Sequence, residues 1–348
     1  MHSRFSHIAL RGVCAAVPSN TEDIADLIKL TDAATGFTLK RVAALAGLQR
    51  RHVAPANIFT GDLAAAAGEA LLQRLNWHPS SLDALFFVSQ TPDFLSPPTG
   101  YLIAAALGLS PECAIMDVSS GCPGMLHGAW LASGHLGKQV RRAIVLSGDV
   151  SSKVVPAGDV GNSVLMGDAV GALALEYDEA ASPISFHMLS FPDTNLSLVN
   201  YDSGYRPMPG KPDGMVMNGN KITEFCLARV PECLQSHLEQ ENASLDEVDV
   251  FFLHQPNKMI LNGLQRRLHV DSSKIPMIFA NYANCSSASL PISICTSSFS
   301  PESGSLRAMF CAFGSGLSVA SLLADWDPSR AFPLVMVDAP VLPSPEQV

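Results

Sequence analysis

Two stretches far apart in this 348-residue chain share one pattern, and that pattern limits the folds open to it. Residues 81–94, SLDALFFVSQTPDF, and residues 247–260, EVDVFFLHQPNKMI, both run from an acidic residue through Phe-Phe to a glutamine and a proline. Each is a short apolar run without alternation, which is typical of a strand covered on both faces. An amphipathic helix is expected before each one, at residues 62–75 and 222–240. Helix followed by buried strand in both halves predicts α/β layers and an internal duplication.

The order of predicted strands and loop-forming stretches suggests how the chain is divided. Further strands are predicted at residues 143–149, 170–177 and 307–316. Residues 191–214, rich in proline, glycine and asparagine, are predicted to form a long loop that joins the halves. We therefore expect three parts, which are an N-terminal half, a C-terminal half and an extended proline-rich appendage, at residues 1–178, 179–326 and 327–348.

Composition excludes several classes of function. Hydrophobic residues make up 47% of the chain and charged residues 16%, so a large core can form. A formal net charge of -10 argues against nucleic acid as a partner. Arg11 interrupts the only apolar stretch near the start, which we interpret as a first β-strand and not as a signal peptide. No uninterrupted apolar run reaches the roughly 18 residues of a membrane span, so a cytoplasmic protein is expected.

The eight cysteines do not form a pattern typical of a disulfide framework, and no CxxC pair suggests zinc. Most of them are interpreted as small buried hydrophobic residues, namely Cys14, Cys113, Cys226, Cys233, Cys295 and Cys311.

Cys122 has a different context, in the stretch DVSSGCPGMLHGAW at residues 117–130. Here a predicted strand enters a turn of small residues and then a helix. Pro123 suits the first helical position, which places Cys122 at or beside the helix N-cap. The helix dipole and free N–H groups there favour a thiolate, so a lowered thiol pKa is expected. Gly121 and Gly124 would allow a tight turn and the close approach of a substrate.

Two other residues could act with such a nucleophile. His254 lies where the apolar run FFLHQPN ends, the usual place for catalytic groups in α/β layers, although a histidine there is often a core residue. Asn284, in FANYANCSSASLP, follows another short apolar stretch and could equally cap a loop. The other nine histidines lie in polar or loop contexts and are assigned no role.

Together these stretches resemble the ketoacyl-ACP synthase III branch of the thiolase superfamily. That family carries a cysteine at a strand–helix elbow, then HQxN, then NYGNTSAAS, and the chain has SSGCPG, HQPN and NYANCSSAS in that order. LMGDAVGALAL at residues 165–175 and FGSGLS at residues 313–318 resemble two more of its signatures. The resemblance covers about residues 5 to 326 and makes Cys122 the expected nucleophile.

The resemblance implies a duplicated αβαβα fold and a homodimer. It implies that Cys122 takes an acyl group from a CoA or acyl carrier protein thioester, with no metal and no further cofactor. Backbone N–H groups of Cys122 and Ser315 would hold the oxyanion. His254 and Asn284 would stabilise the enolate formed when a malonyl-type thioester loses CO₂ and attacks the acyl-enzyme.

The chain departs from relatives that use acetyl-CoA as primer. Those relatives clamp the CoA adenine between a tryptophan and an arginine, where this chain has Arg41 and Leu45, and Val160 replaces a second arginine. Ser96 stands where many relatives place a bulky side chain that reaches into the partner's acyl pocket. These departures suggest a longer primer and a role in secondary metabolism or a modified fatty-acid route.

Basic residues near His254 offer a landing site for an acidic carrier protein. Lys258, Arg266 and Arg267 lie on one predicted helix, with Lys221 and Arg229 on another, although a plain solvated helix face explains them equally well.

Two other functions stay open at this stage. One is an acyltransferase that passes the Cys122 acyl group to an alcohol or amine, although such relatives often replace the asparagine. The other is a non-catalytic partner subunit, although those typically lose the cysteine or the histidine.

Overall fold

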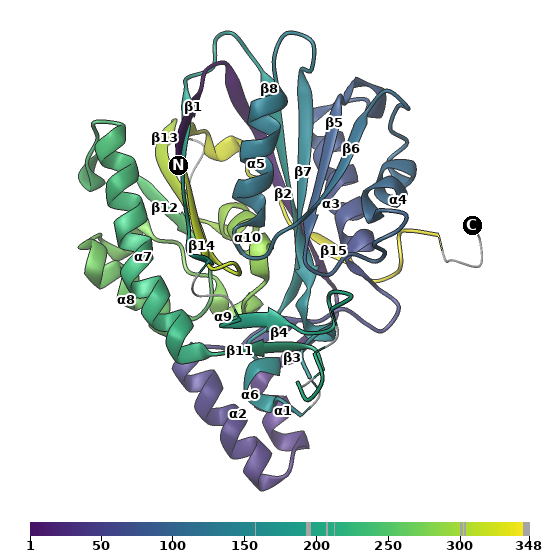
Figure 1. Cartoon of the computed structure of the whole chain (residues 1–348), viewed down its shortest axis with the longest axis vertical. Helices are drawn as coiled ribbons and strands as arrows, with labels where there is room; N and C mark the ends of the chain where they lie inside the picture. Colours follow the sequence, from purple (N-terminus) through teal and green to yellow (C-terminus); the bar gives the residue numbers. More distant parts are fainter. Residues whose placement is uncertain are drawn as a thin grey trace.

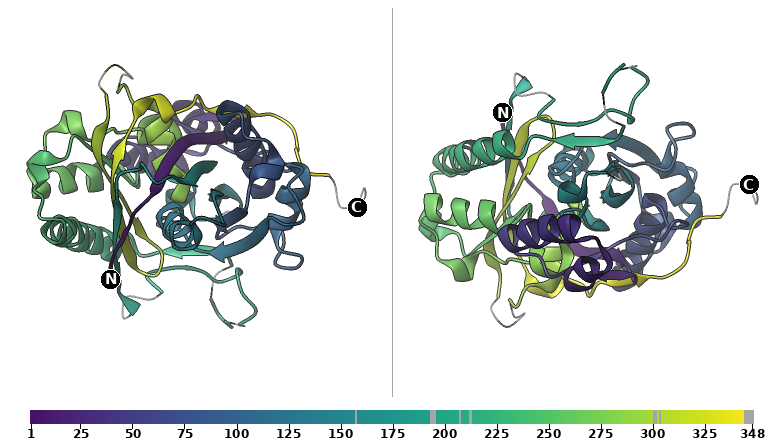
Figure 2. Two further views of the ribbon diagram at one scale, coloured as in Figure 1. Left: turned by 90° about the horizontal axis from the view of Figure 1, so that it is seen from above. Right: turned by 90° about the horizontal axis from the view of Figure 1, so that it is seen from below.

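The computed structural model describes residues 1–343 except 157, 193–195, 207, 212, 300, 301 and 303. Its core consists of two β-sheets with helices between them and on both outer faces (Figure 1). In the two perpendicular views, α7 (Gly219–Gln240) and α8 (Lys258–Leu268) lie on one side of the molecule, and α3 (Thr60–Leu75) and α4 (Thr99–Ala106) lie on the other (Figure 2).

The six-stranded sheet has the order β15-β2-β8-β7-β5-β6. Its strands are β2 (Ile8–Pro18), β5 (Ala84–Ser89), β6 (Ala114–Ser119), β7 (Arg142–Val150), β8 (Asp168–Tyr177) and β15 (Val335–Val337). The five-stranded sheet has the order β1-β9-β14-β13-β12. Its strands are β1 (His2–Phe5), β9 (Ile184–Ser190), β12 (Val250–Leu253), β13 (Leu306–Gly314) and β14 (Ser318–Trp326).

The duplication is visible in the way the strands pair. In the first sheet β5 pairs parallel with β7, and antiparallel pairs then lead through β8 to β2. In the second sheet β12 pairs parallel with β13, and antiparallel pairs lead through β14 to β9. The two stretches that share the Phe-Phe pattern therefore occupy equivalent strands, β5 and β12, and every residue of both is buried. The predicted layered α/β fold is confirmed.

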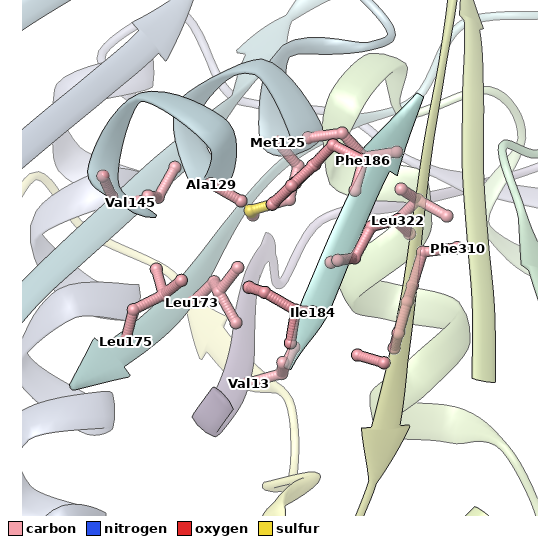
Figure 3. Close-up of a cluster of buried hydrophobic side chains, with 14 of the residues drawn as sticks. Val13, Met125, Ala129, Val145, Leu173, Leu175, Ile184, Phe186, Phe310 and Leu322 are labelled. Carbon is pink, nitrogen blue, oxygen red and sulfur yellow. The ribbon is translucent and has the colours of Figure 1, made fainter. Parts of the chain in front are cut away.

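Helices fill three layers around the two sheets. α3 (Thr60–Leu75) covers the outer face of the first sheet, and α7 (Gly219–Gln240) and α8 (Lys258–Leu268) cover that of the second. α5 (Gly124–His135) and α10 (Ser289–Thr296) lie between the sheets. Figure 3 shows this central layer, where Met125 and Ala129 of α5 pack against side chains of the two facing sheets, among them Val13, Leu173, Phe186, Phe310 and Leu322.

The remaining elements are short and lie mostly on the lower side of the molecule in Figure 1. They are α1 (Ile24–Leu30), α2 (Ala33–Ala46), α4 (Thr99–Ala106), α6 (Val160–Ser163), α9 (Phe279–Tyr282) and the paired strands β3 (Thr21–Asp23) with β4 (Arg50–His52) and β10 (Leu198–Asn200) with β11 (Met215–Met217). None of the helices in the described part of the chain combines the length and apolar character needed to cross a membrane.

The chain ends differ from the simple division into halves. The expected boundary at residue 178 falls between β8 and β9, but β1 pairs with β9 in the second sheet. The proline-rich appendage also adds β15 parallel to β2, and the backbone N–H groups of Val341 and Leu342 donate to Asp62. Each end thus satisfies backbone groups at the edge of a sheet. Of the predicted joining loop, Leu198–Asn200 form β10, and residues 193–195, 207 and 212 lie outside the described residues.

Candidate active site

Cys122 lies in the turn between β6 and α5. The N–H of Gly124 donates to the carbonyl of Gly121 over 2.7 Å, which closes the turn. Pro123 has helical φ of −75° but occupies the N-cap, since α5 begins at Gly124. Cys122 therefore precedes the cap by one residue, and its exposed fraction is only 7%.

Burial raises the pKa of the Cys122 thiol to about 11, and the negative charge of Asp149 acts in the same direction. The side chain of Ser286 and the backbone of Ser315, both next to the thiol, lower the pKa only in part. The expectation of a lowered thiol pKa was therefore wrong for the free protein, because desolvation outweighs the local donors. Cys122 is a neutral thiol at pH 7 and must lose its proton when it attacks.

His254 follows β12 directly, and its backbone N–H donates to the carbonyl of Cys311 over 2.8 Å. Its ring is buried and packs edge-on against Phe313, with ring centroids 5.3 Å apart. Burial lowers the pKa of His254 to about 3, so the imidazole is neutral at pH 7. A neutral imidazole can accept a proton at one nitrogen and donate from the other.

Gln255 holds the turn after His254. Its side-chain NH₂ donates to the carbonyls of Leu253 and Pro276, and its Oε1 accepts from the N–H of Ile278. The side chain is fully buried, so these bonds fix the backbone on which His254 is mounted.

Asn284 is held by backbone and side-chain bonds together. Its N–H donates to the carbonyl of Leu165, and its carbonyl accepts from Gly167, both over 3.0 Å. Its side-chain Oδ1 accepts from the N–H of Ser286 over 3.0 Å. Because the oxygen is occupied, the NH₂ is the end of the amide that remains to donate.

Cys122, His254 and Asn284 line one cavity of about 410 Å³. The structure thus brings together three residues that are far apart in the sequence. Leu45 and Met259 line the same cavity and have exposed fractions of 61% and 49%, so it opens to the surface there. Most of the remaining lining is apolar and includes Val42, Leu165, Leu198, Met217, Ile222 and Phe313.

Gly314 lets the end of β13 approach the nucleophile. A Cβ atom there would lie 2.9 Å from both Cβ and Sγ of Cys122, closer than real contacts allow. Its φ of +153° also favours glycine. This close approach puts the backbone of the next residue, Ser315, beside the Cys122 thiol. The oxyanion donors are expected at this place.

Sequence reasoning missed two neighbours of Cys122. Ser286 places its hydroxyl beside the thiol, and only the run of small hydroxyl residues after Asn284 hinted at it. Cys226 of α7 is buried as expected, but it also lines the cavity. Burial raises the pKa of its thiol, and a negative charge on Cys122 would raise it further. Nothing in its sequence context distinguishes Cys226 from the other buried cysteines, and all eight are free thiols.

Other predicted positions lie outside the centre of the site. Ser96 is exposed in the turn before α4, away from the cavity within this single chain. Lys258 lies exposed at the start of α8, between two residues that line the cavity. Arg266 and Arg267 lie in the last turn of α8, about 12 Å farther along the helix.

The positions that replace an adenine clamp lie near the opening. Arg41 is exposed on α2, and Leu45 follows one turn later on the rim of the cavity. Val160 of α6 packs into the small apolar cluster that joins α2 to the rest of the fold.

The prediction that the other nine histidines lie in polar or loop contexts was wrong in part. His52, His187 and His237 are buried, with exposed fractions of 8% or less. His52 bonds the carbonyl of Pro18 through Nδ1 and stacks on Tyr282.

Comparison with known protein families follows the two halves of the chain. Residues 116–191 match the model of 3-oxoacyl-[acyl-carrier-protein (ACP)] synthase III, and residues 238–326 match the model of its C-terminal part. The chain is also similar to the β-ketoacyl-[acyl-carrier-protein] synthase III of a Synechococcus species, with 33% identity over 300 residues, 80% of this chain and 86% of the relative. The chain belongs to the β-ketoacyl-ACP synthase III family.

Solved structures agree with this assignment. A 3-oxoacyl-(acyl-carrier protein) synthase from Burkholderia xenovorans superposes with a TM-score of 0.91 at 29% identity, covering 97% of this chain and 99% of that one. OleA from Xanthomonas campestris, solved with cerulenin bound, has a TM-score of 0.79 at 19% identity over 93% of this chain and 98% of that one, which shows a shared fold. The duplicated thiolase-type fold predicted for the chain is therefore confirmed, and so is a condensing enzyme of the synthase III type.

Proposed function

We propose that this synthase condenses a Cys122-bound acyl group longer than acetyl with a malonyl-type thioester. The observation that carries the proposal is that Cys122, His254 and Asn284 line a single, largely apolar cavity. The chain retains a thiol, an imidazole and an amide, which together suit both halves of a decarboxylative Claisen reaction.

In the first half, the Cys122 sulfur attacks the carbonyl of an acyl thioester. The thiol proton passes to His254. When the tetrahedral intermediate collapses, the thiolate of the donor thioester leaves and takes this proton from His254. Because the pKa of Cys122 is raised and that of His254 lowered, proton loss accompanies bond formation instead of preceding it. The backbone N–H groups of Cys122 and Ser315 would hold the oxyanion.

In the second half, a malonyl-type thioester occupies the cavity. Its C–C bond to the carboxylate breaks, CO₂ leaves, and the electron pair forms an enolate. A neutral His254 and the NH₂ of Asn284 can both donate to the enolate oxygen. The enolate carbon then attacks the acyl carbonyl, and the Cys122 thiolate leaves and regains a proton.

Two features favour a primer other than free acetyl-CoA. The apolar lining from Leu198, Met217 and Ile222 can take up an acyl chain, at about 0.8 kcal/mol for each buried methylene. Arg41 and Leu45 at the rim do not offer the tryptophan–arginine pair that stacks on adenine. A donor carried on an acidic carrier protein, docking over Lys258 with Arg266 and Arg267, avoids the need for adenine contacts. Such a preference would suit a specialised pathway.

The test is a comparison of acylation rates. Wild-type protein is incubated with acetyl-CoA, octanoyl-CoA and octanoyl-carrier protein, and the mass gained is followed by intact mass spectrometry. We expect octanoyl donors to acylate faster than acetyl-CoA, and Cys122→Ala to gain no mass. Faster acylation by acetyl-CoA would overturn the primer assignment, and acyl mass on Cys122→Ala would overturn the nucleophile.

Two additions refine the test. Met217→Trp should slow octanoyl transfer more than acetyl transfer, because it narrows the cavity, whereas Met336→Trp on the exposed side of β15, outside the cavity, should change neither. Ser96→Phe should slow octanoyl transfer only if a second subunit brings this residue to the site, as a homodimer would. Formation of an ester or amide from alcohols or amines, without release of CO₂ from malonyl donors, would instead indicate the acyltransferase.

A further inference from the structure

A cluster of histidines lies on the outer face of the second sheet, away from the catalytic cavity. β1 and β9 pair so that His2 lies directly opposite His187. β9 and β14 pair so that His187 lies opposite Ser321. Residues opposite one another share a face of the sheet, so three strands present one polar row.

α7 covers this row with two more ligand-type side chains. His237 and Glu241 are four residues apart and so share one face of the helix. The ring centroid of His237 lies 5.6 Å from that of His2 and 5.9 Å from that of His187. Glu241 Oε1 lies 3.0 Å from His2 Nε2. One ligand atom from each of His2, His237 and Glu241 can be chosen so that all lie within 4.8 Å of one another.

Several polar atoms of this cluster are buried without a partner. Within the described part of the chain, His2 Nδ1 and His187 Nε2 make no hydrogen bond, and the 3.0 Å contact of Glu241 Oε1 with His2 Nε2 does not have the geometry of one. The Glu241 side chain has an exposed fraction of only 9%, and His187 of 5%. Buried polar atoms without partners are costly, and three in one cluster point to a bound group that would satisfy them.

Neighbouring side chains contact the proposed ligands, as the residues around metal ligands do in known metal sites. The hydroxyls of Ser185 and Ser321 lie 2.9 and 2.8 Å from Nε2 and Nδ1 of His237, so a metal bound to His237 would replace one of these two hydrogen bonds. Glu241 accepts from Arg4 at Oε2 over 2.8 Å, which leaves Oε1 directed to the histidines.

We propose that His2, His237 and Glu241, with His187 beside them, form a binding site for a divalent transition metal, zinc above all. Two ligand atoms at about 2.0–2.1 Å from a tetrahedral zinc lie about 3.3 Å apart, close to the separation of His2 Nε2 and Glu241 Oε1. Imidazole and carboxylate ligands suit zinc, whereas calcium and magnesium prefer oxygen alone. The positive Arg4 and the N-terminal amine nearby oppose the cation, so Glu241 is the ligand on which affinity depends most.

The site would be structural in its effect. It ties β1 to the C-terminal end of α7, while the N-terminal end of the same helix lines the catalytic cavity at Ile222 and Cys226. His237 is eleven residues beyond Cys226, about 16 Å along the helix. The metal would therefore take no part in the condensation, and the proposal does not depend on the acyl substrate.

The experiment measures zinc binding to the full chain without an affinity tag. A Cys122→Ala background removes the thiol of the catalytic site as a competing ligand. Zn²⁺ is titrated calorimetrically, and bound metal is counted after dialysis. We expect one equivalent, and at least tenfold weaker binding in Glu241→Gln and in His2→Ala. Glu239→Gln on the exposed face of α7 and His269→Asn at the end of α8 are the matched controls, and both should bind as the parent does.

Two further readouts separate a built site from loose binding. Co²⁺ should give the visible absorption of a four-coordinate nitrogen and oxygen site, and Glu241→Gln should abolish it. Zn²⁺ should raise the melting temperature of the parent but not of Glu241→Gln. Binding of zinc that is equal in parent, Glu241→Gln and His2→Ala, or no binding at a tenfold excess over protein, would overturn the proposal.

Discussion

Replacement of Gly314 by alanine tests how closely the end of β13 must approach Cys122. The added Cβ would meet Cβ and Sγ of Cys122 at 2.9 Å, and φ of +153° is strained for any residue with a side chain. Strain of this kind costs on the order of 1–3 kcal/mol. The chain can relieve the contact only by moving the thiol or by moving the backbone that leads to Ser315.

Either movement disturbs acylation. The Ser315 N–H is the expected oxyanion donor, and loss of one such donor typically lowers the rate by roughly 10²–10³. We expect Gly314→Ala to acylate about a hundredfold more slowly than wild type, with a melting temperature only a few degrees lower. The assay is the rate of mass gain from octanoyl-CoA, measured beside the melting temperature.

Gly134→Ala is the matched control. Gly134 lies in α5 with open space where its Cβ would be, so alanine should add helix stability of up to about 1 kcal/mol and leave acylation unchanged. Acylation by Gly314→Ala within threefold of wild type would refute the argument that this glycine sets the oxyanion geometry.

Three further outcomes follow from the same site. Asn284→Ala should lower release of CO₂ from a malonyl thioester by roughly 10²–10³ while sparing acylation. His254→Ala should slow both steps, because His254 also takes the Cys122 proton, but it should slow release of CO₂ more than acylation. Equal loss of both steps in Asn284→Ala would contradict its role at the enolate. Alkylation of Cys122 by iodoacetamide should keep accelerating up to about pH 10, because its pKa is raised to about 11, and a plateau near pH 8 would show an activated thiolate. The free energy of unfolding should fall between pH 7.5 and pH 5. His237 and His254 have pKa values near 3 in the folded protein and about 6.5 in the unfolded chain, so the unfolded state binds protons first. Each of these histidines therefore lowers the free energy of unfolding by about 2 kcal/mol at pH 5. Urea unfolding at the two pH values checks this, and a double His→Gln variant should show a flatter dependence.

The layered fold was predictable because its signal is local. A strand covered on both faces reads as a continuous apolar run, and β5 and β12 carry that signal in equivalent places. The exchange of β1 and β15 between the halves left no such signal. Which edge a terminal strand joins depends on backbone groups more than a hundred residues away, and short runs such as His2–Phe5 would pair equally well with many edges.

The site was predictable in its residues but not in its electrostatics. The order of the three motifs brought out Cys122, His254 and Asn284, because each follows the end of a local element: Cys122 follows β6, His254 follows the buried β12, and Asn284 follows α9. The sign of the Cys122 pKa shift depends on how much of the chain covers the thiol, which no local pattern reports. His237 was misread although its sequence held a clue, since it continues the apolar face of α7 marked by Val230 and Cys233. A histidine on that face is buried by the same packing.

Burial of Cys122 and His254 also limits how the proposed chemistry can begin. The same desolvation that raises the pKa of Cys122 lowers that of His254, so the uncharged thiol and imidazole are the stable pair. A resting thiolate–imidazolium pair would have to overcome both shifts at once. The thiol is therefore inert towards solvent until an acyl carbonyl lies against it, with oxyanion donors ready to accept the charge. Once the acyl group is in place, the imidazole is again neutral and can donate to an enolate. One physical cause, exclusion of water, thus serves both half-reactions.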